Sequence, residues 1–520
     1  MKLLTLLHFY QPYNQQDDIL MRIVNECYLP LTRGLLKNPR AKVVVNINGV
    51  LSRMLVDKGY GEVIDNLKLL VARGQVELTG SAMYHAFLPL LPDAEIDRQI
   101  SVNTEVNKIY FGESFNPKGF FSPEMAVSPN ILRIISSKGY KWIPASNLSY
   151  PDGNPAYDCL YKTSEGTAVL FRDKRVSALM LSGVCKDAVS FIKETTDLHE
   201  KDKYWVAIMD AETFGHHRIG HENFLFDVLS NEFFEPVLFD GLVKAPEGFM
   251  TKDVELRPST WTNEEQDFWL DKEHTQATSS RSFILWRDPE NPIHQQQWEL
   301  TNYVIHLVSA FEDKNSSKYL QAREMLDMAL ASDQFWWASA KPWWSLEMVE
   351  QGAYQLKQVV ITLSLGDESM KKAELMYRKI LDLAFDWQRS GYIRKRHLEN
   401  SSTFMQKPFS KRTHAEWYNQ IILEFEDEMK KAAETRDFEK AIKWRDAILK
   451  LSQGTDIYDV LHVVNELWTA RNIPSVKPLF SHNWEEISEF AKKNMLNITT
   501  EEAFEEWKRT GKRVEPPVDL

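Results

Sequence analysis

The chain has 520 residues, of which 43% are hydrophobic and 26% are charged, and this balance excludes a generally disordered protein. The formal net charge of −12 makes nucleic acid a poor partner, because binding to phosphates requires a basic surface. No run of about 18 apolar residues occurs, so we expect no membrane-spanning helix.

The cysteines and the amino terminus indicate the compartment. Cys27, Cys159 and Cys185 are odd in number and far apart, which favours a reducing environment over a disulfide framework. Residues 1–8 contain a short apolar run without a small-residue cleavage site, so we interpret them as a first strand and not as a signal peptide. We therefore predict a cytoplasmic protein.

The first 210 residues alternate short apolar runs with helical periodicity, a pattern typical of a parallel sheet or barrel. Helices are expected at residues 50–73, 94–110 and 128–138. Strands are expected at residues 3–9, 43–47, 75–78, 119–121, 142–144, 168–171 and 205–209. About seven βα steps are enough to close or nearly close a barrel.

Polar side chains follow most of these strands, at the end where α/β folds bind their ligands. They are His8, Tyr10, Gln11, Asn46, Asn48, Glu77, His85, Glu124, Arg172, Asp173, Asp210 and Glu212. Because these ends converge on one face of a barrel, we predict a pocket of acids, histidines and amides. Taken singly, each has another interpretation: His8 as a satisfied core histidine, for example, or Arg172 and Asp173 as a simple ion pair.

Two carboxylates carry the prediction of chemistry. Asp210 ends the apolar run 204–209, and Glu124 lies just beyond the run 119–121. Two carboxylates at the mouth of one sheet are the minimum for breaking a glycosidic bond. The alternative is that both are solvated loop acids.

Helical periodicity dominates from residue 291, with helices expected at residues 294–311, 318–330, 345–363 and 370–387. We interpret the loop after the second helix as reaching over the pocket, with Asp333 and Trp336 as substrate contacts; an aromatic plug between helices is the alternative. The predicted domains are a barrel, 1–290, a helical domain that completes the site, 291–400, and a C-terminal helical region, 401–520.

Residues 424–450 of the C-terminal region resemble the UVR motif, a helical hairpin that mediates protein contacts. Its two charged helices are expected to join at Thr435 and Arg436, with Asp437 as an N-cap. The expected apolar face consists of Phe438, Ala441, Ile442, Ile448 and Leu449. The resemblance implies a protein partner or a second copy of the chain, whereas an ordinary packed hairpin is the other interpretation.

Five segments, in order, resemble glycoside hydrolase family 57 over roughly residues 1–350. His8-Phe-Tyr10-Gln11-Pro12 is similar to the family's opening His-x-His-Gln-Pro, with Tyr10 in place of the second histidine. The other four segments lie at residues 74–92, 121–124, 209–212 and 333–336.

The resemblance implies an α/β fold with an incomplete (β/α)7 TIM-like barrel followed by α-helical domains. It also implies retaining action on α-linked glucans, of the α-amylase, 4-α-glucanotransferase or branching type, with no metal or other cofactor. Glu124 would be the nucleophile and Asp210 the acid/base. The implied substrate contacts are His8, Tyr10, Gln11, Glu77, His85, Glu212, His217, Asp333 and Trp336.

The two acids must hold opposite protonation states, so we expect a polar, hydrogen-bonded site for Glu124 and a desolvated or acid-flanked one for Asp210. Two alternatives stay open. One is a metal-dependent, deacetylase-like hydrolase with His8, Asp210, His216 and His217 as ligands. The other is a non-catalytic α-glucan-binding relative.

Overall fold

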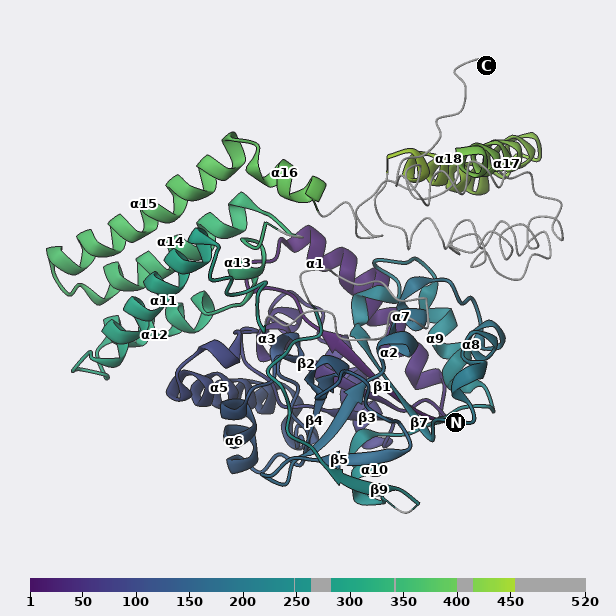
Figure 1. The fold of residues 1–520 in the computed structure, drawn as a ribbon, viewed down its shortest axis with the longest axis horizontal. Helices are drawn as coiled ribbons and strands as arrows, with labels where there is room; N and C mark the ends of the chain where they lie inside the picture. Colours follow the sequence, from purple (N-terminus) through teal and green to yellow (C-terminus); the bar gives the residue numbers. More distant parts are fainter. Residues whose placement is uncertain (247, 263–281, 341–342, 400–414, 454–520) are drawn as a thin grey trace. The chain divides into compact units, whose positions relative to one another are not determined.

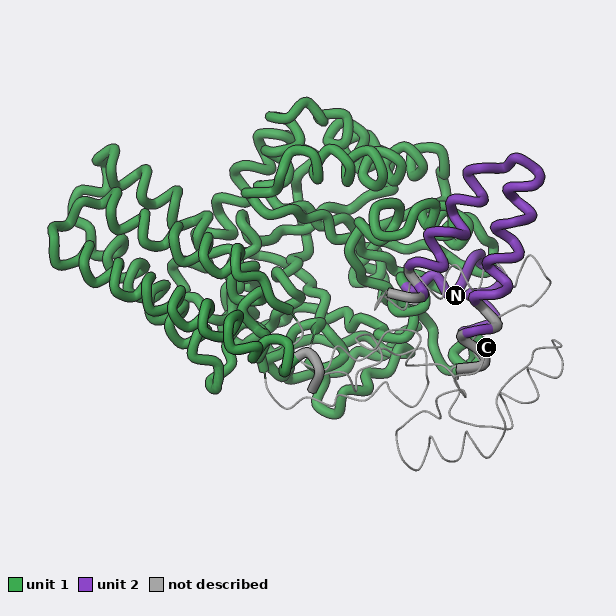
Figure 2. The backbone as a smooth tube through the Cα atoms, turned by 90° about the horizontal axis from the view of Figure 1, so that it is seen from above, with its two compact units in different colours: residues 1–181, 195–398 green, residues 182–194, 399–520 purple. Residues whose placement is uncertain are grey.

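The computed structural model describes residues 1–246, 248–262, 282–340, 343–399 and 415–453 (Figure 1). Residues 1–181 and 195–398 form one compact unit, and residues 182–194 and 399–520 form a second (Figure 2). Among the described residues, no helix is both long enough and apolar enough to cross a membrane. The three predicted domains remain a prediction.

Four parallel strands form the centre of the first unit, in the order β3-β2-β1-β7. They are β1 Lys2–Phe9, β2 Val43–Ile47, β3 Val76–Leu78 and β7 Tyr204–Asp210. Apart from residues at the ends and Glu77, their side chains are buried. This two-sided burial explains why these strands are continuous apolar runs in the sequence.

Residues 119–121 continue the parallel arrangement beyond β3. Gly80 bridges to Phe120, and Gly119 bridges to Trp142 at the start of β4 Trp142–Ser146. A Cβ atom on Gly119 would lie 2.1 Å from the Trp142 ring, so only glycine permits this close approach.

The last two predicted strands complete the set. β4 pairs in parallel with β6 Ala168–Arg172, and the backbone N–H of Asp173 donates to the carbonyl of Val206 in β7 at 2.8 Å. The seven predicted strand segments thus form a parallel series, and β6 meets β7 through this hydrogen bond. The predicted incomplete (β/α)7 barrel is confirmed.

Several elements differ from the prediction. The strands β5 Cys159–Lys162, β8 Glu235–Pro236 and β9 Met250–Asp253 were not expected. The single helix predicted at 50–73 is wrong, since it is divided into α3 Gly49–Asp57 and α4 Glu62–Ala72. The break falls at Gly59, whose φ of +84° cannot continue a right-handed helix.

The first unit and residues 182–194 of the second unit contain the remaining α-helices before the hairpin. They are α1 Asp17–Ile23, a π-helical turn Val24–Tyr28, α2 Leu29–Lys37, α5 Asp93–Phe111, α6 Pro129–Ser137, α7 Lys174–Ser182, α8 Ala188–Glu194, α9 His221–Ser230, α10 Phe239–Lys244, α11 Pro292–Ser309, α12 Ser317–Ala329, α13 Asp333–Trp336, α14 Leu346–Leu363, α15 Asp367–Arg389 and α16 Tyr392–Glu399. The four long helices α11, α12, α14 and α15 confirm the predicted helical segment.

A buried ion network joins α5 of the barrel to α12. Arg323 donates to both carboxylate oxygens of Glu95, at 2.9 and 2.8 Å, and to Asp327 at 2.9 Å. Arg98 also donates to Asp327. Together with the apolar core that the two segments share, this network fixes the helices after residue 291 against the barrel.

Replacing Arg323 with methionine is expected to lower the free energy of unfolding by about 3–5 kcal/mol, because Glu95 is left charged and buried without its partner. Urea denaturation measures this change. Arg378→Met is the matched control, because it breaks an exposed ion pair with Glu374 and should change stability little. Equal stability of the two variants would contradict the prediction.

In the second unit, α17 Ala415–Glu434 and α18 Phe438–Gln453 form the predicted hairpin. Asp437 caps α18 by accepting the backbone N–H of Lys440 at 3.1 Å. The predicted apolar face is wrong, because Phe438 and Leu449 are 64% and 52% exposed. The buried side chains are instead Phe425, Ala432, Trp444, Ala447 and Leu451, with Phe425 stacked on Trp444.

Candidate active site

The carboxyl ends of β1, β2 and β7 form one polar layer. His8 pairs in register with Asn46 on one side and with Asp210 on the other. Its Nδ1 lies 2.6 Å from the side-chain oxygen of Asn46, whose amide donates to the Thr79 hydroxyl at 2.9 Å. Burial lowers the pKa of His8 to about 4, so its imidazole is neutral at pH 7.

Glu124 lies in a sharp turn directly after residues 119–121. Its φ of +59° is in the left-handed region, which is a strained conformation for glutamate. Trp261 makes two hydrogen bonds to Glu124. Its indole N–H donates to Glu124 Oε2 at 2.7 Å, and its backbone N–H donates to the Glu124 carbonyl at 3.1 Å. The sequence gives no signal for this pairing, since the two residues are 137 positions apart.

An aromatic stack next to Glu124 connects the barrel to α13. The His85 ring stacks on Tyr10 at 4.0 Å and on His8 at 5.1 Å, and its Nδ1 lies 3.9 Å from Glu124 Oε1. Ser332 contacts the same His85 nitrogen, at 3.0 Å. The Tyr10 hydroxyl donates to Asp333 Oδ2 at 2.7 Å. Five of the predicted site residues are thereby brought together across more than 300 positions of the chain.

A second buried group lies beyond Asp210. The Glu212 carboxylate accepts hydrogen bonds from the Gln11 amide at 3.0 Å and from the Tyr28 hydroxyl. Burial, with the charge of Asp210, raises the pKa of Glu212 to about 8. Gln11 and Glu212 are thus partners of each other, and their role as substrate contacts remains a proposal.

Three of the predicted substrate contacts, Glu77, His217 and Trp336, have no contact with the stacked rings of His8, Tyr10 and His85. Glu77 accepts from the Trp142 indole and from the backbone N–H of Asp240, deeper in the barrel, which argues against a sugar contact. His217 is exposed in the turn after Glu212. Trp336 packs against Trp343 at 4.9 Å, and its contact with substrate stays a prediction.

The four candidate metal ligands do not converge. His8 and Asp210 are neighbours, but His216 Nδ1 lies 2.5 Å from Glu26 and His217 is exposed. Within the described part of the chain, no group of three or more His, Cys, Asp or Glu side chains is arranged to hold a metal ion. These positions do not favour the deacetylase-like interpretation.

Burial dominates the electrostatics of the two acids. Burial raises the pKa of Glu124 to about 8, and the charges of Asp210 and Asp333 act in the same direction. Burial also raises the pKa of Asp210, to about 6, whereas Arg172 opposes that shift. The expected hydrogen bond to Glu124, from Trp261, and the expected desolvation of Asp210 are both present, but burial also raises the pKa of Glu124, and by more than that of Asp210.

These pKa values predict a bell-shaped dependence of kcat/KM on pH. Activity should fall below about pH 6, where both acids are protonated, and above about pH 8, where both are ionised. Asp333→Asn should move the alkaline limb to lower pH, because removing that charge lowers the pKa of Glu124.

The control for this pH profile is Asp240→Asn, which removes a carboxylate beside Glu77 instead of beside Glu124. It should leave the alkaline limb in place. An alkaline limb that is identical in wild type and Asp333→Asn would contradict the assignment.

Comparison with known proteins agrees with this architecture. Residues 4–237 match the model of glycosyl hydrolase family 57, and residues 419–454 match the UvrB/uvrC motif. The resemblance to family 57 is therefore confirmed over the barrel, and that of the hairpin to the UVR motif is confirmed too.

Individual relatives are similar over parts of their length. The chain is 30% identical to alpha-amylase 1 of Dictyoglomus thermophilum over 147 residues, which are 28% of this chain and 21% of that protein. It is 24% identical to an alpha-amylase of Pyrococcus horikoshii over 240 residues, 45% of this chain and 37% of that protein. The chain thus spans well under half the length of these curated relatives.

Among solved structures, the fold is similar to a GH57-type branching enzyme from the archaeon Pyrococcus horikoshii. The TM-score is 0.57 at 16% identity, and the match covers 72% of this chain and 94% of that chain. This likeness confirms the fold class.

Proposed function

We propose that this protein is a retaining glycoside hydrolase or glucanotransferase that acts on α-linked glucans. The observation that carries the proposal is that Glu124 and Asp210 both lie next to the stacked rings of His8 and His85. Asp210 pairs in register with His8, and Glu124 Oε1 lies 3.9 Å from His85 Nδ1. The family match over the same residues supports it.

In the proposed mechanism, Glu124 attacks the anomeric carbon while Asp210 protonates the leaving oxygen, and a glycosyl-enzyme forms. Asp210 then deprotonates water, for hydrolysis, or the hydroxyl of an acceptor sugar, for transfer. The attack needs an ionised Glu124, and the Trp261 indole N–H supports that state because its hydrogen bond lowers the carboxyl pKa. Retention requires the carboxyl groups to lie about 5–5.5 Å apart in the working enzyme.

The test combines maltoheptaose, chain-length analysis and NMR of the first products. Hydrolysis releases new reducing ends, transfer redistributes chain lengths without new reducing ends, and either product should form with the α configuration. First products of β configuration would overturn the double displacement. No conversion of maltoheptaose, amylose or glycogen, together with intact binding, would support the non-catalytic relative instead.

A further inference from the structure

We propose that the π-helical turn Val24–Tyr28 positions the acid/base Asp210, and that Tyr28 is the residue through which it acts. Asp210 is the last residue of β7, so its backbone runs directly into residues 211–217, which we call the acid/base loop. The inference rests on the proposed function and adds to it a positioning residue that lies 184 positions before its partner in this loop.

The turn is wider than a turn of α-helix. The backbone N–H of Leu29 donates to the carbonyl of Val24, five residues earlier, whereas an α-helix bonds residues four apart. A π turn therefore holds more than the about 3.6 residues of an α-helical turn, and successive side chains lie less than about 100° apart around the axis. Three consecutive residues, Glu26, Cys27 and Tyr28, can thus face the same neighbour. Single π turns are frequent at functional sites.

Cys27 and Tyr28 hold the beginning of the acid/base loop. Cys27 Sγ donates to the carbonyl of Ala211 at 3.0 Å, and the Tyr28 hydroxyl donates to the Glu212 carboxylate. Both donors are fully buried, and only 6% of Glu212 is exposed. Because water does not replace a lost hydrogen bond at such a position, these two bonds restrain the residues directly after Asp210.

Glu26 holds the later part of the acid/base loop. Its Oε2 lies 2.5 Å from His216 Nδ1. The backbones of the turn and the loop touch at Gly215, where a Cβ atom would lie 1.9 Å from the Glu26 carbonyl oxygen. Three consecutive residues of one turn therefore contact the loop at four of its seven positions.

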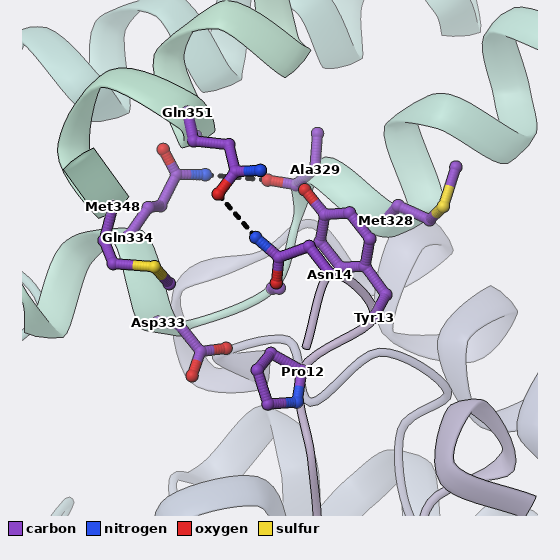
Figure 3. Close-up of a pocket in the computed structure, with 11 residues that line it drawn as sticks. Pro12, Tyr13, Asn14, Met328, Ala329, Asp333, Gln334, Met348 and Gln351 are labelled. Carbon is purple, nitrogen blue, oxygen red and sulfur yellow. Dashed lines mark hydrogen bonds between the residues drawn. The ribbon is translucent and has the colours of Figure 1, made fainter. Parts of the chain in front are cut away.

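The turn itself is held from both sides. After it, the Thr32 hydroxyl of α2 donates to the Tyr28 carbonyl at 2.8 Å and accepts from the Asn66 amide of α4 at 3.2 Å. Before α1, the Asn14 amide donates to the side-chain oxygen of Gln351 in α14 at 2.5 Å, and Figure 3 shows these two side chains facing each other. Hydrogen bonds thus connect the segment that contains the turn to α4 and to α14.

Tyr28 also extends the link between β1 and β7. The two strands pair in register as far as His8 and Asp210. Directly beyond β1, the Gln11 amide donates to Glu212 at 3.0 Å and to the Tyr28 hydroxyl at 3.3 Å. Asp210 therefore lies between the last paired residues of the strands and this group of three side chains. Its backbone is restrained on both sides along the chain, which limits the positions that its carboxyl group can take.

The test compares two substrates of the full chain. Tyr28→Phe removes the hydroxyl and keeps the ring, which stacks on Phe9 at 4.8 Å. A misplaced acid slows only the release of a leaving group that needs a proton. We expect kcat/KM, which reports formation of the glycosyl-enzyme, to fall about 10- to 100-fold with maltoheptaose and less than about threefold with an aryl α-maltoside that releases dinitrophenolate.

The matched control is Tyr204→Phe. Tyr204 begins β7, and its buried hydroxyl donates to the Cys159 carbonyl at 2.8 Å, at the end of the strand opposite to Asp210. This variant should keep the wild-type ratio between the two substrates. Equal losses on both substrates in Tyr28→Phe, or no loss on either, would overturn the inference and leave the proposed function standing. A wild type that converts no α-glucan would overturn both.

Hydrogen exchange tests the same contacts without a substrate. The backbone N–H groups of Phe214 and His217 donate to carbonyls within the acid/base loop. They should exchange at least about fivefold faster in Tyr28→Phe than in wild type, and at the wild-type rate in Tyr204→Phe. Glu26→Ala changes a half-buried pair at the surface and should accelerate the same exchange, so the test does not depend on the folding of one variant. Wild-type exchange rates in both Tyr28→Phe and Glu26→Ala would overturn the role of the turn.

Discussion

Glu124→Ala is expected to lower turnover of α-glucans by a factor on the order of 10⁴ to 10⁶, because the covalent step loses its nucleophile. The missing side chain leaves space below the anomeric carbon. Azide can enter this space and attack an α-glucosyl substrate that has a good leaving group, with Asp210 intact. The product should be the β-glucosyl azide, whose inverted configuration NMR identifies.

The matched variant is Glu124→Gln, in which the amide still fills the site. It should be equally inactive, and azide should restore little activity. Because Trp261 donates to the Glu124 carboxylate, both variants need a check of thermal stability. Turnover within tenfold of wild type in Glu124→Ala, or an azide product of retained configuration, would remove Glu124 from the role of nucleophile.

Asp210→Ala is expected to have the second largest effect and to act on a different step. General acid/base catalysis contributes about 10²- to 10⁴-fold, so glucan turnover should fall by that factor. Substrates with good leaving groups need little protonation and should still form the glycosyl-enzyme. The missing base then slows deglycosylation, and azide should accelerate it by giving the α-glucosyl azide, with retained configuration.

The diagnostic measurement for Asp210→Ala is a burst of the leaving group from an aryl α-glucoside, followed by a slow steady state that azide speeds up. Asp240→Asn, which removes a carboxylate near Glu77 instead of near Glu124, is the control and should behave as wild type. If Asp210→Ala gave the inverted azide and Glu124→Ala the retained one, the two roles would have to be exchanged.

The barrel strands could be predicted because strands covered on both faces must be apolar along their whole length, as in β1 and β7. Two of the missed strands, β8 and β9, carry no such signal, whereas β5 is short but buried at three of its four residues. β8 has only two residues, and all four residues of β9 are exposed. Short edge strands of this kind are stabilised by their backbone partners and not by a hydrophobic pattern.

The position of Glu77 in the barrel likewise depends on strand pairing and not on a local sequence pattern. The sequence places Glu77 near a strand end. In the structure it pairs with Val44, two residues before Asn46, the partner of His8. Thr79 lies at the level of Asn46 and bonds it. Since inward-facing residues of a barrel form layers, this difference of two residues places Glu77 in a deeper layer.

The sequence by itself determined the seven strand segments, the helices at 94–110 and 128–138, the four long helices after residue 291, and the positions of Glu124 and Asp210 after strands, because periodicity and strand ends are local properties. Only the tertiary structure decided that Trp261 donates to Glu124, that Tyr10 donates to Asp333 and that burial raises the pKa of Glu124. These features depend on contacts between residues over 100 positions apart and on burial. The contact of Asp333 with Tyr10 follows from how the helical segment packs against the barrel, and that of Trp261 with Glu124 from how the chain before this segment returns to the barrel. No local pattern records either.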